Sequence, residues 1–496
     1  MPLKACDRCY SAKEKCSFSG DDQQCTRCRR LKLSCSKSRL TRRMGRRPAA
    51  RAFPHGQVQI WSAQPQQSNV DVRTRESPRI LRQSTSRSPA STSTVSETPT
   101  PDRDDVVILA PERLLASPTT LRTTSDALRT VMDVEQFSVI HMPFMWGTSF
   151  IPEAQKTVHA ILCLSAPILT EGYLAFLGLM TGYQRSLVMR QGEPDMRQAA
   201  KGLQRLRSVT IAHDYDAACA LFLGQTMYVF NVLTAPYSST AHSIVRSALM
   251  STKPWFSRLI RYPIMDTIIM TPVLIDTVEC VVHREVPIIR LPQTDRVIID
   301  RYAGLCATLL PHFYDICVCS HAMKTNALDV GTGSHAGFFE QLAAIEQRIQ
   351  AWAPPNPPEL YTNFTQPEVL AMVTQANVYR LAGLLTIHRL RYPFGVQDEL
   401  AHELANGIFT ELRYFANSPF KEATALPVVF PLTLAMLELE GPGEELIDQL
   451  AIFAVQTSSA SRLQGFVKQV RASKASGFEG VWFDLVETQL HVAAPP

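Results

Sequence analysis

Residues 6–35 read CDRCYSAKEKCSFSGDDQQCTRCRRLKLSC, and this stretch decides how the N-terminus of the chain must fold. Its cysteines follow the spacing C-x2-C-x6-C-x8-C-x2-C-x6-C, so two similar halves stand in tandem. The residues before and around them lack the apolar core of a signal peptide. A dense cysteine cluster without secretion indicates a metal site rather than a disulfide framework. The six candidate ligands are Cys6, Cys9, Cys16, Cys25, Cys28 and Cys35.

The number of cysteines constrains the metal. Zinc takes four ligands in structural sites, so six thiolates are too many for one ion and too few for two separate ions. Two ions are accommodated if two sulfurs are shared between them. No histidine lies among the cysteines, and the nearest is His55, which disfavours Cys2His2 and Cys3His fingers. A zinc knuckle for protein contacts and a disulfide-linked cluster are the alternatives.

This pattern resembles the fungal binuclear zinc-cluster DNA-binding domain, in its six cysteine positions and in the basic segments 13–15 and 29–32. The resemblance implies two Zn²⁺ ions bridged by Cys6 and Cys25. It also implies a short helix that starts at Cys9 and enters the major groove. Lys13 would read a CGG-like half-site through guanine O6 and N7. In one departure from the family, Tyr10 replaces a residue that is usually basic, which puts one phosphate contact in doubt.

Basic residues concentrate at the same end of the chain. Residues 1–51 hold 15 Lys/Arg and four acidic residues, a charge of +11, whereas the other residues carry −6 and the whole chain +5. Such asymmetry indicates an acidic partner, most often nucleic acid. Most of these side chains would contact phosphates, which position the protein without specifying sequence. The expected DNA contacts are Arg8, Lys13, Lys15, Arg27, Arg29, Arg30, Lys32, Arg42, Arg43, Arg46 and Arg47.

We expect three parts: a binuclear zinc-cluster domain at 1–40, a basic and then Ser/Thr/Pro-rich disordered linker at 41–124, and an all-α regulatory domain at 125–496. Within residues 84–101, 14 of 18 positions are Ser, Thr or Pro, and such a segment cannot offset its ordering entropy by burial. The basic segment 37–48 predicts a nuclear import signal, with a solvated linker as the alternative. Candidate proline-directed phosphorylation sites are Ser77, Ser88, Thr98 and Thr100.

Long apolar segments at helical spacing fill the chain after residue 125. Residues 365–368, Thr-Gln-Pro-Glu, form a capping-box pattern that predicts the start of a helix, and Tyr392-Pro393 predicts its end. Residues 217–235 carry no charge and have the length of a membrane span. Because Gln225 and Asn231 lie within that segment and no basic clamp flanks it, we expect a buried core helix instead.

Three segments of this domain resemble the regulatory domain of fungal zinc-cluster factors: 276–287, 376–390 and 481–482. The resemblance implies a regulator without catalysis that senses metabolites or partner proteins. The sequence contains no HExxH, GxSxG or GxxxxGK[ST] motif, and Gly331–Gly337 predicts a loop. The six cysteines after residue 160 are expected in the core. A metal site of Cys317 and Cys319 with His312 and His321 is a weaker alternative to buried structural roles.

The sequence therefore predicts a nuclear, sequence-specific RNA polymerase II transcription factor of a fungus, and not an enzyme. Its partners would be double-stranded DNA and the transcription machinery or co-regulators, without a membrane. A homodimer is compatible with the sequence, although Pro111 and Pro118 interrupt any coiled coil in 106–137. The tract 43–48 resembles the same region in the regulator of the aflatoxin pathway, which favours control of a secondary-metabolite gene cluster. The alternatives are a DNA-tethered metabolite sensor or repressor whose helical domain binds a small ligand, and a scaffold that binds nucleic acid nonspecifically.

Overall fold

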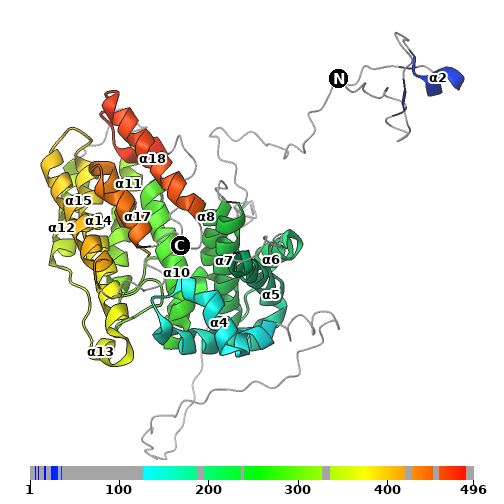
Figure 1. Cartoon of the computed structure of the whole chain (residues 1–496), viewed down its shortest axis with the longest axis horizontal. Helices are drawn as coiled ribbons and strands as arrows, with labels where there is room; N and C mark the ends of the chain where they lie inside the picture. The colour runs from blue at the N-terminus through cyan, green and yellow to red at the C-terminus, as the bar shows by residue number, and fades with distance from the viewer. Residues whose placement is uncertain are drawn as a thin grey trace, which may run out of the picture. The chain divides into compact units, whose positions relative to one another are not determined.

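The computed structural model divides the chain into two compact units, Met1–Ile60 and Trp61–Pro496 (Figure 1). In the first unit the structure describes residues 6, 9, 16–17, 24–31 and 35. In the second it describes 127–186, 195–235, 240–326, 336–418, 427–450 and 457–486. The predicted linker at 41–124 and its phosphorylation sites lie outside the described residues.

The regular secondary structure of the second unit is helical, and a single isolated bridge between Asp300 and Gly304 is the only β pairing among its described residues. This confirms the predicted all-α class. Its longer helices are α4 (Val134–His141), α5 (Ile151–Ser186), α6 (Met196–Ser208), α7 (Asp214–Thr234), α8 (Thr240–Thr252), α10 (Asp266–His283), α11 (Leu310–Asn326), α12 (Ala336–Ala351), α14 (Gln366–Arg391), α15 (Asp398–Ala416), α16 (Val429–Glu438), α17 (Pro442–Gln449) and α18 (Thr457–Ala475). Short helices are α9 (Phe256–Leu259), α13 (Glu359–Asn363) and α19 (Trp482–Val486), with 3-10 turns η1 (Met142–Phe144), η2 (Thr148–Phe150), η3 (Lys253–Trp255), η4 (Pro263–Met265) and η5 (Cys306–Thr308).

Helix α10 joins two groups of helices. On one side α5 packs on α6 and α7, and α7 packs on α8; on the other, α14 packs on α12, α15 and α16. Helix α10 contacts α7 and α8 of the first group. It also contacts α11, which packs on α12 and α14 of the second group (Figure 1). All residues of α10 except His283 are buried, and these include the acidic Asp266, Asp276 and Glu279 as well as the apolar residues between them.

Helix α7 covers nearly all of the uncharged segment 217–235, which has the length of a membrane span. By length and composition it could cross a bilayer, but 83% of its most apolar window is buried inside the unit. Its neighbours are α5, α8 and α10, and Gly224 lets it approach α8 closely, since a Cβ there would lie 2.5 Å from that of Ala248. The prediction of a buried core helix is confirmed.

The capping box of α14 is also confirmed. Thr365 is the N-cap, and the Glu368 carboxylate accepts the Thr365 amide over 2.8 Å. The structure adds a contact that lies 219 residues away in sequence: Glu368 accepts from the amide and the hydroxyl of Ser149, over 3.0 and 2.6 Å. The carboxylate that starts α14 therefore also anchors the turn η2 in front of α5.

The end of the described chain packs onto the domain. The sequence 478–485 combines acidic and bulky apolar residues, a mixture also found in activation segments. In the structure Trp482 and Phe483 are buried, and their rings stack with centroids 3.9 Å apart. Asp484 pairs with Arg284 over 3.2 Å. Helix α19 thus closes the fold against α10.

Candidate metal centre and the α10 polar cluster

The six N-terminal cysteines converge on two overlapping groups. Cys6, Cys9, Cys16 and Cys25 bring their sulfurs within 4.8 Å of one another, and so do Cys6, Cys25, Cys28 and Cys35. Cys6 and Cys25 belong to both groups. This is the arrangement that two tetrahedral ions with two shared sulfurs require, and the cluster can hold metal ions.

Distances between sulfurs distinguish a metal site from disulfides. Cys6 lies 3.7 Å from Cys25 and from Cys28, and Cys9 lies 3.6 Å from Cys25. Sulfurs bound to one tetrahedral zinc at about 2.3 Å are about 3.8 Å apart, whereas a disulfide needs about 2.05 Å. All six cysteines are free thiols. The donor set therefore fits zinc and excludes the disulfide alternative in this structure.

The two halves repeat the same backbone contacts. The Cys9 amide donates to Cys6 Sγ over 3.5 Å, and the Cys28 amide donates to Cys25 Sγ over 3.4 Å. The contact from Cys28 is the largest influence on Cys25 and lowers the pKa of its thiol to about 6. A thiol with a lowered pKa supplies the thiolate that a metal needs. The sequence repeat is therefore also a structural repeat around the shared sulfurs.

Helix α2 (Thr26–Arg30) places basic side chains beside the second half of the cluster. It begins directly after Cys25 and carries Arg27, Arg29 and Arg30, the last two exposed. Cys9 is helical, at the position where the resemblance predicts a recognition helix to begin, but the residues after it are not described. The other expected DNA contacts, Arg8, Lys13, Lys15, Lys32, Arg42, Arg43, Arg46 and Arg47, also lie outside the described residues.

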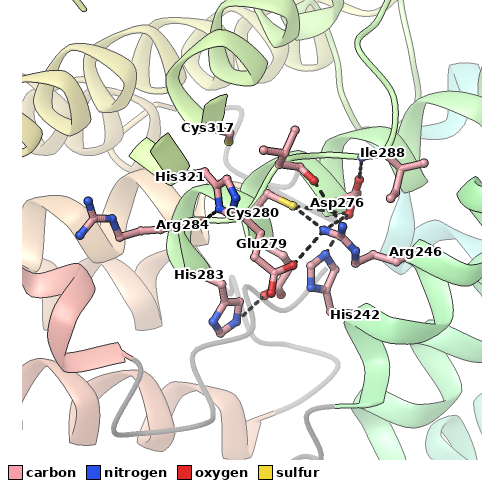
Figure 2. Close-up of polar contacts among 12 residues, drawn as sticks. His242, Arg246, Asp276, Glu279, Cys280, His283, Arg284, Ile288, Cys317 and His321 are labelled. Atoms are coloured by element: carbon pink, nitrogen blue, oxygen red, sulfur yellow. Dashed lines mark hydrogen bonds and ion pairs between the residues drawn. The ribbon is translucent and has the colours of Figure 1, made fainter. Parts of the chain in front are cut away.

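In the second unit, a polar cluster surrounds Asp276 of α10, whose side chain is 1% exposed (Figure 2). Its Oδ1 accepts from His242 Nε2 over 2.9 Å and from Arg246 Nη1 over 3.5 Å, both on α8. Its Oδ2 accepts from the Ile288 amide over 2.7 Å. Arg246 also donates to the Val286 carbonyl over 3.3 Å. The cluster ties α8 and the segment after α10 to α10 itself.

His242, Asp276 and Cys280 also have the ligand types and the proximity of a metal site. However, Arg246 Nη1 lies 2.9 Å from Cys280 Sγ, so a cation already faces the same atoms. Burial, followed by the charge of Asp276, raises the pKa of the Cys280 thiol. We therefore assign this cluster a structural role. His242 and Arg246 were not predicted from the sequence, where the available signal was a histidine and an arginine four residues apart in one helix.

The weaker alternative of a metal site in α11 finds no support among the described residues. Cys317 Sγ donates to the Thr277 carbonyl over 3.7 Å, and His321 Nδ1 bonds the Arg284 carbonyl over 3.0 Å. Cys319 and His312 do not join them in a ligand group. The expectation that all six later cysteines lie in the core is wrong for Cys163, which is exposed on α5 next to His159. The expected loop at Gly331–Gly337 is described only at its end, where 336–337 begin α12.

Comparison with known proteins supplies one match. Residues 242–475 match the family model of the fungal specific transcription factor domain. The match begins at His242 of the polar cluster and includes α10, α14 and α16. No family model of the binuclear zinc cluster matches the cysteine region. No curated protein and no solved structure matches the chain.

Proposed function

We propose that the chain, whose residues 242–475 match the fungal specific transcription factor domain, is a fungal transcription regulator that binds DNA sequence-specifically through its cysteine cluster. The observation that carries the proposal is the pair of four-sulfur groups that share Cys6 and Cys25. That arrangement is what the binuclear zinc-cluster resemblance requires. A regulator with a metal-binding, strongly basic N-terminus is best explained as a DNA-binding factor.

Zinc has a structural role in this proposal. The segment 6–35 is too short to bury an apolar core, and its only buried hydrophobic cluster within the described residues consists of the cysteines themselves. Two Zn²⁺ ions held by the six cysteines, with Cys6 and Cys25 shared, would supply the folding free energy. Apparent zinc contributions in small fingers are about 10–16 kcal/mol. The backbone amides that donate to the sulfurs orient them for the metal.

The basic residues have two different roles in DNA recognition, base contact and phosphate contact. Lys13 reads guanine in a CGG-like half-site, because a lysine ammonium donates to O6 and N7 in the major groove. Arg29 and Arg30 of α2, which are exposed, contact phosphates and set the position of the cluster on the duplex. The segment 37–48 extends these contacts and directs import into the nucleus. The target is a set of fungal genes, and the basic tract at 43–48 favours a secondary-metabolite cluster.

Selection of bound sites from random DNA by the full-length protein tests this proposal, followed by affinity measurements over a range of salt concentrations. We expect enrichment of CGG and a log–log salt slope of about −5 for six phosphate contacts. Lys13→Ala should abolish the preference for CGG and leave the slope nearly unchanged. Arg30→Ala, the matched control, should weaken binding to all sequences alike and reduce the slope by about one. Equal affinity for CGG and scrambled sites would overturn the proposal and favour the nonspecific scaffold.

A further inference from the structure

Helix α6 presents an exposed face on which every charged side chain is positive. The helix packs on α5 and α7 at the edge of the second unit (Figure 1). Its buried residues are small or apolar, and its charged residues are all exposed: Arg197, Lys201, Arg205 and Arg207. The chain after residue 51 carries a net charge of −6, so this face is opposite in sign to the rest of the chain.

The arrangement of the basic side chains distinguishes α6 more than their number does. Helix α18 also has four basic residues and no acidic residue, but it binds some of them to its own domain. Arg471 donates to the Met436 and Leu439 carbonyls over 2.8 Å each. Lys474 pairs with Asp398 over 4.0 Å. The basic side chains of α6 point outward instead, where a partner can reach them.

The carboxylates near α6 do not neutralise its exposed face. Arg205 Nε lies 3.9 Å from Glu171 Oε2, close to the limit of an ion pair, and the Arg205 side chain is 56% exposed. Asp195, the N-cap, turns its carboxylate to the Arg197 amide over 3.0 Å and so caps the helix. Arg197 and Lys201 make no ion pair with any residue that the structure describes.

Three of these residues form a basic stripe along the helix, because Arg197, Lys201 and Arg205 recur every four residues. Neighbours in the stripe are about 6 Å apart along the helix axis. Like charges at this spacing destabilise a helix, and Arg197 lies in the first turn, where the helix dipole disfavours a cation. An anion bound along the stripe removes both costs, so the stripe indicates a partner with several negative charges in a row.

The chemistry of the face favours a phosphate backbone over a protein or a membrane. A protein interface needs an apolar centre, and a membrane-bound helix needs an exposed apolar side. The apolar side of α6, with Ala199 and Leu206, is buried, and the exposed Met196 lies at the first position of the helix. Phosphates need only exposed cations, which position a duplex without specifying its sequence.

We propose that the exposed face of α6 is a second DNA contact, in which Arg197, Lys201 and Arg205 bind phosphates of the duplex that the cysteine cluster recognises. The inference rests on the proposed DNA binding and adds a site in the second unit that needs no metal. Two linked contacts on one duplex bind more tightly than either alone. The contribution of α6 depends on salt, because each phosphate contact releases a counterion.

Affinity measurements over a range of salt concentrations test this contact with the full-length protein. Two duplexes carry the same CGG site, one of about 10 bp, which has room for the cluster, and one of about 40 bp, and the log–log salt slope is measured on each. We expect the wild-type slope to be steeper on the long duplex by about two to three. Arg197→Gln with Lys201→Gln should reduce the slope on the long duplex by about two and leave the slope on the short duplex unchanged.

The matched control removes the same charge elsewhere on the domain. Arg413→Gln with Lys468→Gln changes exposed residues of α15 and α18, and it should keep both wild-type slopes. Equal wild-type slopes on the two duplexes, or equal slopes for the α6 variant and the control, would refute the DNA contact and favour an acidic protein as the partner. A wild type without preference for CGG on the short duplex would instead refute the proposed function. The difference between the slopes decides the α6 contact in that case too, because phosphate contacts do not depend on sequence.

Photo-crosslinking then locates the contact on the helix. Gln204 is exposed and lies three residues after Lys201, on the same face. A photo-reactive side chain placed at Gln204 should crosslink to the long duplex, and one placed at Gln469, which is exposed on α18, should not. Absence of the crosslink from Gln204 on fully bound duplex, or equal crosslinking from the two positions, would contradict a contact through α6.

Discussion

Arg389 of α14 and Glu438 of α16 form a bidentate ion pair inside the helical domain. Arg389 Nη2 donates to Glu438 Oε2 over 2.6 Å, Arg389 Nε donates to Oε1 over 2.7 Å, and both side chains are 1% exposed. Arg389 also pairs with Asp398 over 2.7 Å and donates to the Pro393 carbonyl over 3.1 Å. The pair fixes the end of α14 to α15 and α16.

Removing Glu438 should destabilise the domain, because the charge of Arg389 then stays buried without its main partner. Glu438→Leu leaves Arg389 with Asp398 as its remaining carboxylate, which is 26% exposed, and we expect a loss of about 3 kcal/mol in the free energy of unfolding. Urea unfolding measures this loss. The double variant Arg389→Met with Glu438→Leu should recover part of it, because neither charge then remains buried alone. A loss below about 1 kcal/mol for Glu438→Leu would contradict the assigned role of the pair.

Helices α5 and α6 approach each other through two glycines. A Cβ on Gly202 would lie 2.8 Å from the Cα atom of Gly172, and backbone cannot move aside cheaply. We expect Gly202→Ala to destabilise the domain by about 1–3 kcal/mol, as overpacking does. Gly178→Ala, on the exposed side of α5 with no atom within 4 Å, is the control and should stabilise by about 0.5–1 kcal/mol through helix propensity. Equal effects of the two changes on Tm would show that the helices do not meet at this point.

Local sequence patterns predicted the parts of the structure that depend on neighbouring residues. The capping box at Thr365 and Glu368, the end of α14 before Pro393 and the buried state of α7 all follow from short patterns. The six ligands and the need for two shared sulfurs follow from the number and spacing of the cysteines, whereas the choice of Cys6 and Cys25 as the shared pair came from the resemblance to the zinc-cluster family. Long-range partners were not accessible: nothing in the sequence joins Glu368 to Ser149, or Asp276 to His242. Arg301 had no local signal either, since its hydrogen bonds to the Thr267 and Phe144 carbonyls join segments that are distant in the sequence.

His141 should make the domain sensitive to acid. Burial and the charge of Arg301 lower its pKa from 6.5 to about 3, and its Nε2 pairs with the Tyr173 hydroxyl over 2.9 Å. Below pH 6.5 the unfolded chain binds a proton that the folded protein excludes, so this contribution to stability is present above pH 6.5. It is lost as pH falls toward 3, at up to about 1.4 kcal/mol per unit.

Urea unfolding at pH 7, 6, 5 and 4 measures the effect of His141. His141→Gln keeps a hydrogen-bonding group for Tyr173 and removes the titration, so the variant should lose about 2–3 kcal/mol less than the wild type between pH 7 and pH 4. The difference between the two proteins isolates this residue from the acidic groups that titrate in both. Parallel pH profiles would mean that His141 is protonated in the folded state.

The cysteine cluster predicts a graded loss of zinc. Cys25 belongs to both four-sulfur groups and Cys16 to one, so Cys25→Ser should lower the zinc content by nearly two ions per chain and Cys16→Ser by about one. Cys163→Ser is the control, because that thiol is exposed on α5. Elemental analysis of the purified variants measures the zinc content.

Chelation of the wild-type protein should unfold residues 6–35 and abolish DNA binding. The helical circular dichroism of the second unit and its Tm should stay unchanged, because that unit has its own core. Two ions retained by Cys25→Ser, or DNA binding that survives chelation, would remove the basis for a shared-sulfur cluster.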